Sequence, residues 1–316
     1  MDAQFTLFLL ATLAALIASW FLAPVAWARG LLALARSLTG MRSRSIDVDG
    51  VRWHYLEGGR GPVLVAVHGF GADADHWLHI ALGLRRRYRI IAPDLPGFGT
   101  SATGEGLAFD IASQAARLEA FLDRLGVNEP LLLGSSMGGW IVTQYAATRP
   151  ERARALWLMA PLGATGCRES PLLTAIDTGR DSPVRLASRA DFERNVVTPM
   201  FYRRPWIPYP FRVFYGRLAV QRCAEAERIF KQVRGDSTPL EELARRVSAP
   251  VLLQWGEEDE AVDVSCAGPL REAFANIEVH VHPRTGHLPM LEIPVESLRV
   301  FGHFEGRQGG GQGHFP

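Results

Sequence analysis

Short apolar runs, each bounded by polar or glycine-rich segments, recur along the chain. The clearest lie at residues 63–67, 89–93, 130–133, 155–159 and 250–256. Strands of a parallel sheet are covered on both faces, so they read as continuous apolar runs rather than as alternating ones. Between the runs, apolar residues recur at helical spacing, most clearly from 108 to 125. The pattern predicts an α/β fold with a mostly parallel central sheet and flanking helices.

Less regular segments complete this expected fold. They predict an antiparallel strand pair at 44–49 and 51–57 and a helix at 75–87. They also predict a strand at 278–283 and a closing helix at 295–304. The last residues, 306–316, are rich in glycine and are expected to form a disordered tail.

The start of the chain has a different pattern. No charged residue occurs from Ala3 to Ala28, and Phe5 to Phe21 is almost continuously apolar. A helix of about 20 such residues can cross a bilayer. We therefore expect residues 1–43 to form an uncleaved N-terminal membrane anchor and linker. Within it, 30–38 forms either a short interfacial helix or a simple linker.

Charge near the apolar segment predicts its orientation. Four arginines follow it, Arg29, Arg36, Arg42 and Arg44. Positive charge beside a membrane span favours the cytoplasmic side. The remainder of the chain is therefore expected on the cytoplasmic side of the membrane.

A cleaved signal peptide is the alternative. Ala26-Trp27-Ala28 fits the A-x-A pattern of a cleavage site, which would make the protein secreted. However, the residues before the apolar segment lack a positive charge and include Asp2. The uncleaved anchor is therefore the preferred interpretation.

Composition narrows the choice of compartment and partner. The 316 residues are 47% hydrophobic, which is enough for a large core, and a formal net charge of +1 gives no reason to expect nucleic acid. Cys167, Cys223 and Cys266 are odd in number, widely spaced and without a metal-binding pattern. They predict no disulfide framework and a reducing compartment.

One motif introduces catalytic chemistry. Gly134-Ser135-Ser136-Met137-Gly138 fits G-x-S-x-G, with an expected strand before it and an expected helix after it. A sharp strand-to-helix turn lifts a serine hydroxyl out of the sheet, and small flanking residues allow the close backbone approach. Ser136 is therefore the predicted nucleophile.

An acid and a histidine follow the serine in the order that this kind of site requires. Asp259 comes three residues after the strand-ending Gly256, and His287 follows the next strand. His287 would accept the proton of Ser136, and Asp259 would fix the tautomer of the imidazole. Asp263 is the alternative acid. The other carboxylates of this turn are expected to be solvated: Glu257, Glu258 and Glu260.

An oxyanion hole requires backbone N–H groups aimed at the developing negative charge. Met137 directly follows the nucleophile, and Phe70 lies in the glycine-rich turn after the strand 63–67. We predict that these two residues donate to the oxyanion. His68 and Asp94 are expected to stabilise turns rather than to carry protons.

These motifs carry a family resemblance. Residues from about 50 to 304 resemble the α/β-hydrolase superfamily, most closely membrane-anchored monoacylglycerol lipases of the ABHD6 type and related bacterial lipases. The likeness rests on His68-Gly69-Phe70-Gly71, Asp94-Leu95-Pro96-Gly97-Phe98-Gly99, the serine motif, Trp255 to Ser265, and Gly286-His287 with Glu292-Ile293-Pro294.

The resemblance implies an α/β-hydrolase fold with a helical cap inserted into the core. We expect the two parts of the core at 44–163 and 247–305, and the cap or lid at 164–246. The cap contains an aromatic, proline- and arginine-rich run at 201–211. This run is expected to pack on the core; contact with a membrane interface is the alternative.

Together, these features predict a serine hydrolase that cleaves carboxylic esters through a Ser-His-Asp triad and an acyl-enzyme intermediate. A lipid ester such as monoacylglycerol is the expected substrate, with no metal and no organic cofactor. Two alternatives remain. One is a carbon–carbon bond hydrolase of the meta-cleavage type, which uses the same triad, and the other is a non-catalytic hydrolase-like module that binds a small molecule or partner.

Overall fold

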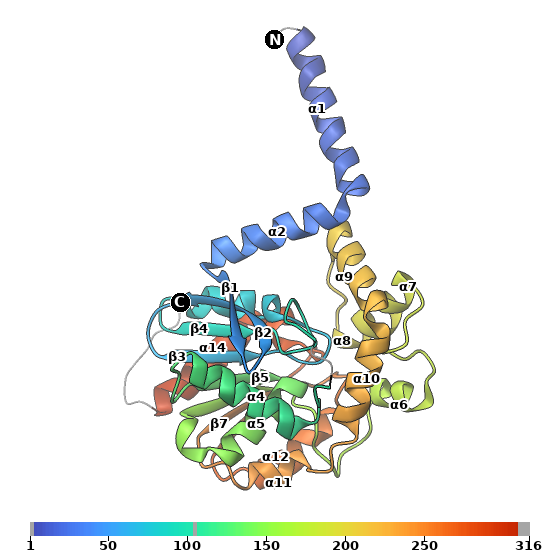
Figure 1. Cartoon of the computed structure of the whole chain (residues 1–316). Helices are drawn as coiled ribbons and strands as arrows, with labels where there is room; N and C mark the ends of the chain where they lie inside the picture. The colour runs from blue at the N-terminus through green and yellow to red at the C-terminus, as the bar shows by residue number, and fades with distance from the viewer. Residues whose placement is uncertain (1–2, 104–105, 309–316) are drawn as a thin grey trace.

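An eight-stranded sheet forms the centre of the computed structural model, which describes residues 3–103 and 106–308 (Figure 1). The strand order is β1-β2-β4-β3-β5-β6-β7-β8. The strands are β1 (Arg42–Val48), β2 (Val51–Gly59), β3 (Val63–Val67), β4 (Arg89–Pro93), β5 (Leu131–Ser135), β6 (Ala155–Met159), β7 (Val251–Gly256) and β8 (Ile277–His282).

Most of the sheet is parallel. β1 pairs with β2 and β2 with β4 in antiparallel register, and every other neighbouring pair is parallel. The predicted sheet, including the antiparallel pair at its start, is therefore confirmed. The carboxyl ends of β3, β5, β6, β7 and β8 lie at the same edge, where an α/β protein places its functional loops.

Helices cover both faces of the sheet and enclose one apolar cluster on each. α4 (Ile111–Arg124), α5 (Met137–Thr148) and α12 (Ala267–Ala273) supply the larger cluster, which includes Phe121, Ile141 and Leu270. α3 (Leu78–Leu84), α13 (Pro289–Glu292) and α14 (Pro294–Gln308) supply the other cluster, which includes Leu84 and Phe301. Both clusters are sealed from water, as the apolar strand pattern requires.

Two expected elements differ in extent. The segment 75–87 was expected to be one helix, but a 3₁₀ turn (η1, Ala74–Trp77) precedes α3, which ends at Leu84. The carboxylate of Asp73 accepts a hydrogen bond from the N–H of Asp75 and so starts the tighter turn. The expected tail from 306 is wrong for its first residues, because α14 continues to Gln308; residues 309–316 lie outside the described residues.

The segment between β6 and β7 is mainly helical and lies at one side of the sheet (Figure 1). Its elements are α6 (Pro171–Thr178), α7 (Arg189–Phe192), a π-helical turn η3 (Glu193–Val197), α8 (Thr198–Met200), α9 (Tyr209–Gln221), α10 (Cys223–Arg234) and α11 (Leu240–Ala244). Of these, α11 packs against the core helix α5 although it falls within the expected cap.

Two helices precede the sheet. α1 (Ala3–Leu22) extends away from the body of the molecule, buries none of its residues and is long and apolar enough to cross a membrane (Figure 1). α2 (Pro24–Thr39) lies across the body, so the expected segment 30–38 is helical rather than a simple linker. Pro24 occupies the first turn of α2, where its missing N–H costs no hydrogen bond.

A disulfide joins Cys167 to Cys266, with the Cα atoms 4.9 Å apart. The prediction that the cysteines form no disulfide is therefore wrong. The two residues are 99 positions apart in the sequence. They meet because Cys167 follows β6 and Cys266 follows the adjacent strand β7, and such proximity depends on the strand order rather than on spacing.

Candidate active site

Ser136 occupies the tight turn between β5 and α5. Its backbone has φ 53° and ψ −122°, an unfavourable conformation for a residue with a side chain. Neighbouring strands hold it there: the N–H of Ser136 donates to the carbonyl of Met159, and the N–H of Leu162 donates to the carbonyl of Ser136, both at 3.0 Å. The expected sharp strand-to-helix turn is therefore present and strained, and the role of Ser136 as nucleophile stays a prediction.

The two glycines of the motif leave no room for a side chain, because a Cβ atom at either position would clash with the backbone. A Cβ atom on Gly138 would lie 2.2 Å from the carbonyl oxygen of Val67, and one on Gly134 would lie 2.6 Å from the carbonyl oxygen of Gly138. Both distances are shorter than a non-bonded contact allows. Larger residues would push α5 away from β3 and so displace Ser136.

Asp259 and His287 are in direct contact. The Nδ1 atom of His287 lies 2.7 Å from Oδ2 of Asp259, and both side chains are almost fully buried. Asp259 follows β7 and His287 follows β8, so neighbouring parallel strands bring them together. The alternative acid, Asp263, instead accepts from the N–H of Ser265 and contacts Arg168.

Trp255 is a further partner of the acid. Its indole N–H donates to Oδ2 of Asp259 at 3.1 Å, while the N–H groups of Ala261 and Val262 donate to Oδ1. These hydrogen bonds fix the carboxylate that orients His287. Sequence analysis assigned Trp255 no role; the only available signal was its position four residues before Asp259.

Two glutamates hold the loop that carries His287. Glu292 accepts hydrogen bonds from the N–H groups of Gly286, Tyr202 and Arg203 at 3.0–3.2 Å. Glu258 accepts from the N–H of Thr285 at 2.9 Å, so its expected role in a solvated turn is wrong. The carboxylate of Glu292 therefore holds together the loop that carries His287 and the cap segment that contains Tyr202 and Arg203.

The predicted oxyanion donors flank Ser136. A Cβ atom on Gly69 would lie 3.0 Å from Cβ of Ser136, so the turn containing Phe70 packs closely against Ser136. Met137 is the first residue of α5, where an N–H has no acceptor within the helix. The ring of Phe70 packs edge-on against Phe98 and Phe230, which fixes its turn against the cap.

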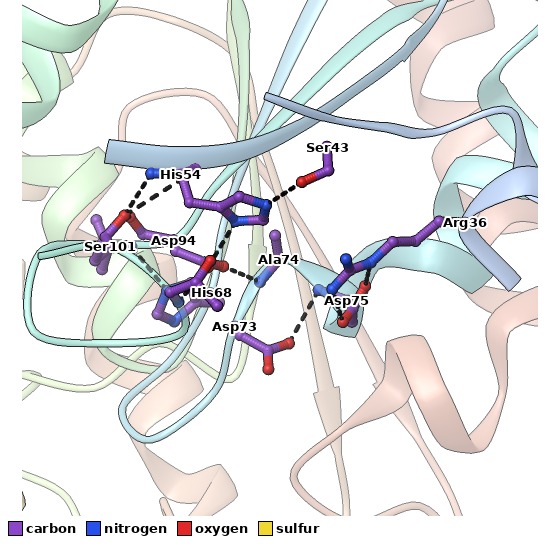
Figure 2. Close-up of polar contacts among 11 residues, drawn as sticks. Arg36, Ser43, His54, His68, Asp73, Ala74, Asp75, Asp94 and Ser101 are labelled. Carbon is purple, nitrogen blue, oxygen red and sulfur yellow. Dashed lines mark hydrogen bonds and ion pairs between the residues drawn. The ribbon is translucent and has the colours of Figure 1, made fainter. Parts of the chain in front are cut away.

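His68 and Asp94 stabilise the surrounding turns, as expected (Figure 2). His68 lies within hydrogen-bonding distance of the Gly69 carbonyl and accepts from the N–H of Leu95; burial lowers its pKa and keeps it neutral. Burial alone would raise the pKa of Asp94. Hydrogen bonds from His54 and from the N–H of Thr100 outweigh that effect and lower it.

Among the described residues, the Ser136 hydroxyl has no hydrogen bond of its own, whereas the His287–Asp259 pair is already formed. Catalytic hydrogen bonds of a free enzyme often tighten only when substrate binds. The arrangement can therefore support nucleophilic attack by a serine with a histidine base, provided that His287 reaches Ser136 in the complex.

A cavity of about 270 Å³ lies in the cap. Arg204 and Arg212 both form ion pairs with Glu193 at its wall. The remaining lining is apolar or aromatic: Phe192, Val197, Pro205, Trp206, Ile207, Phe211 and Tyr215. Neither Ser136 nor His287 lines this cavity, so it is separate from the catalytic side chains.

Comparison with known proteins agrees with this geometry. Residues 62–201 match the family model described as alpha/beta hydrolase fold. The chain is 27% identical to Lipase 3 of Moraxella sp. (strain TA144), covering 85% of this chain and 86% of that lipase. It is 25% identical to human monoacylglycerol lipase ABHD6, covering 90% and 88%. Among solved structures, a membrane phospholipase A, titled a bacterial virulence factor, is 34% identical with a TM-score of 0.86, covering 96% of this chain and 98% of that chain.

Proposed function

Because the chain belongs to the α/β-hydrolase family and is an ester hydrolase of the lipase and esterase type, we propose that Ser136, His287 and Asp259 form its catalytic triad. The observation that carries this proposal is the buried His287–Asp259 hydrogen bond at the same sheet edge as the strained Ser136 turn.

The proposed reaction is acyl transfer in two steps. Ser136 Oγ attacks the ester carbonyl while Nε2 of His287 takes the hydroxyl proton, and Asp259 stabilises the imidazolium. The N–H groups of Phe70 and Met137 stabilise the oxyanion. His287 then protonates the leaving alcohol. Water, deprotonated by His287, attacks the acyl-enzyme and releases the carboxylic acid and free Ser136.

A lipid ester is the proposed substrate class. The membrane-spanning candidate α1 contacts the cap directly, since the rings of Phe21 and Tyr209 lie 5.2 Å apart. Trp206, 84% exposed, stands at the apolar cap cavity. We propose monoacylglycerol as the first candidate, in line with the similarity to monoacylglycerol lipases. A membrane phospholipid is the second, favoured by the higher identity to a phospholipase A.

We further propose that α1 remains as a membrane anchor and that the catalytic domain faces an oxidising compartment. The Cys167–Cys266 disulfide supports this side, since disulfides persist outside the reducing cytosol. The four arginines after α1 favour the opposite, cytoplasmic side that sequence analysis predicted. We give the disulfide more weight, because the charge rule describes a statistical excess of Lys and Arg in cytoplasmic loops, whereas a disulfide needs an oxidising compartment to persist.

Hydrolysis of a p-nitrophenyl ester series from acetate to palmitate tests the proposed reaction. Wild-type protein is compared with Ser136→Ala, using monoacylglycerol and phosphatidylcholine as parallel substrates. Ser136→Ala is expected to lose about 10³-fold or more in kcat, as removal of a triad nucleophile does in serine hydrolases. A preference for medium or long acyl chains is expected from the similarity to lipases.

The same assay separates the alternatives. Folded protein that cleaves no ester but consumes a conjugated dienoate would favour the carbon–carbon bond hydrolase. Folded protein that also fails to react with a serine-directed fluorophosphonate probe would favour the non-catalytic binding module.

A further inference from the structure

α2 has two different faces. Pro24, Ala28 and Thr39 are buried against the body of the protein, whereas Leu34 and Leu38 are 54% and 65% exposed. α1, which is apolar throughout, leaves the body at the start of α2 (Figure 1). An exposed leucine pair on a helix beside a membrane span fits burial of that face in the lipid interface.

The inner face of α2 carries Arg36, which reaches the catalytic domain. Its Nε and Nη2 atoms donate to the two carboxylate oxygens of Asp75 at 2.7 and 2.6 Å. The Asp75 side chain is only 6% exposed, and the hydrogen bond to it raises the pKa of Arg36. A two-point, charge-assisted contact of this kind fixes both distance and orientation.

Asp75 lies at the end of the segment that supplies one oxyanion donor. We define residues 69–75 as the oxyanion loop, which begins in contact with Ser136 and contains Phe70. The loop is tightly bonded: the N–H of Ala72 donates to the carbonyl of Gly69, and the N–H of Asp75 donates to Asp73 at 3.0 Å. A displacement of Asp75 is therefore passed along a short, stiff segment to Phe70.

Figure 2 shows the two fixed points of this segment. On the core side, Asp94 accepts from the N–H of Ala74 at 2.8 Å. On the side of α2, Arg36 holds Asp75. One support of the oxyanion loop therefore comes from the membrane-proximal helix rather than from the sheet.

We propose that Arg36 is a positioning residue that couples the seating of α2 on the membrane to the geometry of the oxyanion hole. The proposal rests on the proposed function, because it assigns Phe70 to the oxyanion. Arg36 touches no substrate; it acts through Asp75. With α2 seated in lipid, the Arg36–Asp75 contact holds Phe70 N–H at the position where the oxyanion forms.

Arg85 provides a matched control. Its Nη1 donates to the carbonyl of Leu38 at 2.8 Å, so it also ties α2 to the core, and within the described residues it forms no hydrogen bond or ion pair with the oxyanion loop. Removing Arg85 tests whether any loosening of α2 lowers activity. Removing Arg36 tests the specific link to Asp75.

The experiment measures kcat and KM of the full chain in phosphatidylcholine vesicles with p-nitrophenyl butyrate. Arg36→Ala is expected to lower kcat about ten-fold with KM nearly unchanged, since a misplaced donor affects the transition state more than substrate binding. Arg36→Lys, which can make only part of the two-point contact, should recover part of the loss. Asp75→Asn should also lower kcat. It should lower the unfolding temperature less than a substitution in the apolar core does.

The membrane component has its own test. The double variant Leu34→Ser/Leu38→Ser changes only exposed side chains and should lower kcat in vesicles. If the coupling runs through Arg36, adding Arg36→Ala to this variant should cause little further loss, because both changes break the same link.

Several results would overturn the proposal. These are an Arg36→Ala enzyme with wild-type kcat, an Arg85→Ala enzyme with an equal loss, or fully additive losses in the combined variant. Ser136→Ala is measured alongside. If it is as active as the wild type, the proposed function fails; if it is inactive while Arg36→Ala is unimpaired, only the coupling fails.

Discussion

At the scale of one residue, Asp73 has a carboxyl group whose pKa is strongly raised by its surroundings. Burial and the negative charges of Asp75 and Asp94 together raise its pKa to about 8, while the hydrogen bond from the N–H of Asp75 and the charge of Arg36 act in the opposite direction. Tyr215 of α9 also faces this cluster, and its own pKa is raised by burial and by the same carboxylates. Asp73 is therefore mostly neutral at pH 7 and charged in alkaline solution.

A pH-dependent stability follows from Asp73. Its folded pKa lies above the ordinary value of 3.8, so the folded state holds a proton that the unfolded state releases. The stabilising contribution is complete below about pH 4, falls as the pH rises and is lost once the pH passes about 8. Asp73→Asn should therefore gain stability relative to the wild type between these limits, by at most about 1.4 kcal/mol per pH unit.

Thermal unfolding at a series of pH values from 5 to 9 checks this expectation. The difference in Tm between Asp73→Asn and the wild type should increase up to about pH 8 and then level off. Asparagine can still accept the hydrogen bond from the N–H of Asp75 through Oδ1, so the turn is preserved. A difference in Tm that does not change with pH would contradict a neutral Asp73 at pH 7.

Sequence alone could locate the residues of the candidate triad because their chain order and local context are distinctive. Asp259 and His287 are 28 positions apart, and each directly follows a strand. Trp255 and Arg36 could not be assigned in the same way. The contact of Arg36 with Asp75 spans 39 positions and depends on where α2 lies over the oxyanion loop, which no local pattern records.

At the scale of elements, the loop before α13 shows how the histidine and the cap are joined. Glu292 accepts N–H groups from both the histidine loop and the start of the 201–211 run. The strands and long helices could be predicted from apolar periodicity. The loop contacts could not, because a carboxylate that accepts backbone N–H groups has the same sequence appearance as a solvated one.

Glu292→Gln is expected to lower both activity and stability. The amide replaces one acceptor oxygen with a donor, so at least one of the three exposed or half-buried N–H groups loses its partner, at a cost of about 1 kcal/mol. The His287 loop should become less well positioned, and kcat should fall. Thermal unfolding and p-nitrophenyl ester hydrolysis measure the two effects.

Glu296→Gln is the control for this variant. Glu296 is on the next helix and pairs with Arg299 three residues away, in an exposed ion pair of the kind worth at most about 1 kcal/mol. A Glu292→Gln protein that matches Glu296→Gln in Tm and kcat would show that Glu292 does not hold the histidine loop.

At the scale of the whole molecule, the chain combines a helix fit to span a membrane with a disulfide-linked catalytic domain. Apolar length was sufficient to predict the helix. The side of the membrane was not predictable in the same way, because the arginines and the disulfide favour opposite sides. The disulfide could not be inferred from the sequence, since its two cysteines meet through the pairing of β6 with β7.

Topology is tested with fusions at the C-terminus of the full chain in a Gram-negative host. The proposed orientation predicts an active alkaline phosphatase fusion and a dark green fluorescent protein fusion. Thiol labelling of the denatured protein should modify only Cys223 before reduction and all three cysteines afterwards. A fluorescent fusion with three reactive thiols would instead place the domain in the cytoplasm.

The disulfide also changes what a protease can do to this molecule. It closes a covalent ring of residues 167–266, which contains all the helices between β6 and β7, and β7 itself. A single cut in the exposed residues 202–206 would leave Ser136 on one fragment and both Asp259 and His287 on the other. The ring would keep the two fragments together, so a nicked enzyme could retain its triad until a reductant separates the pieces.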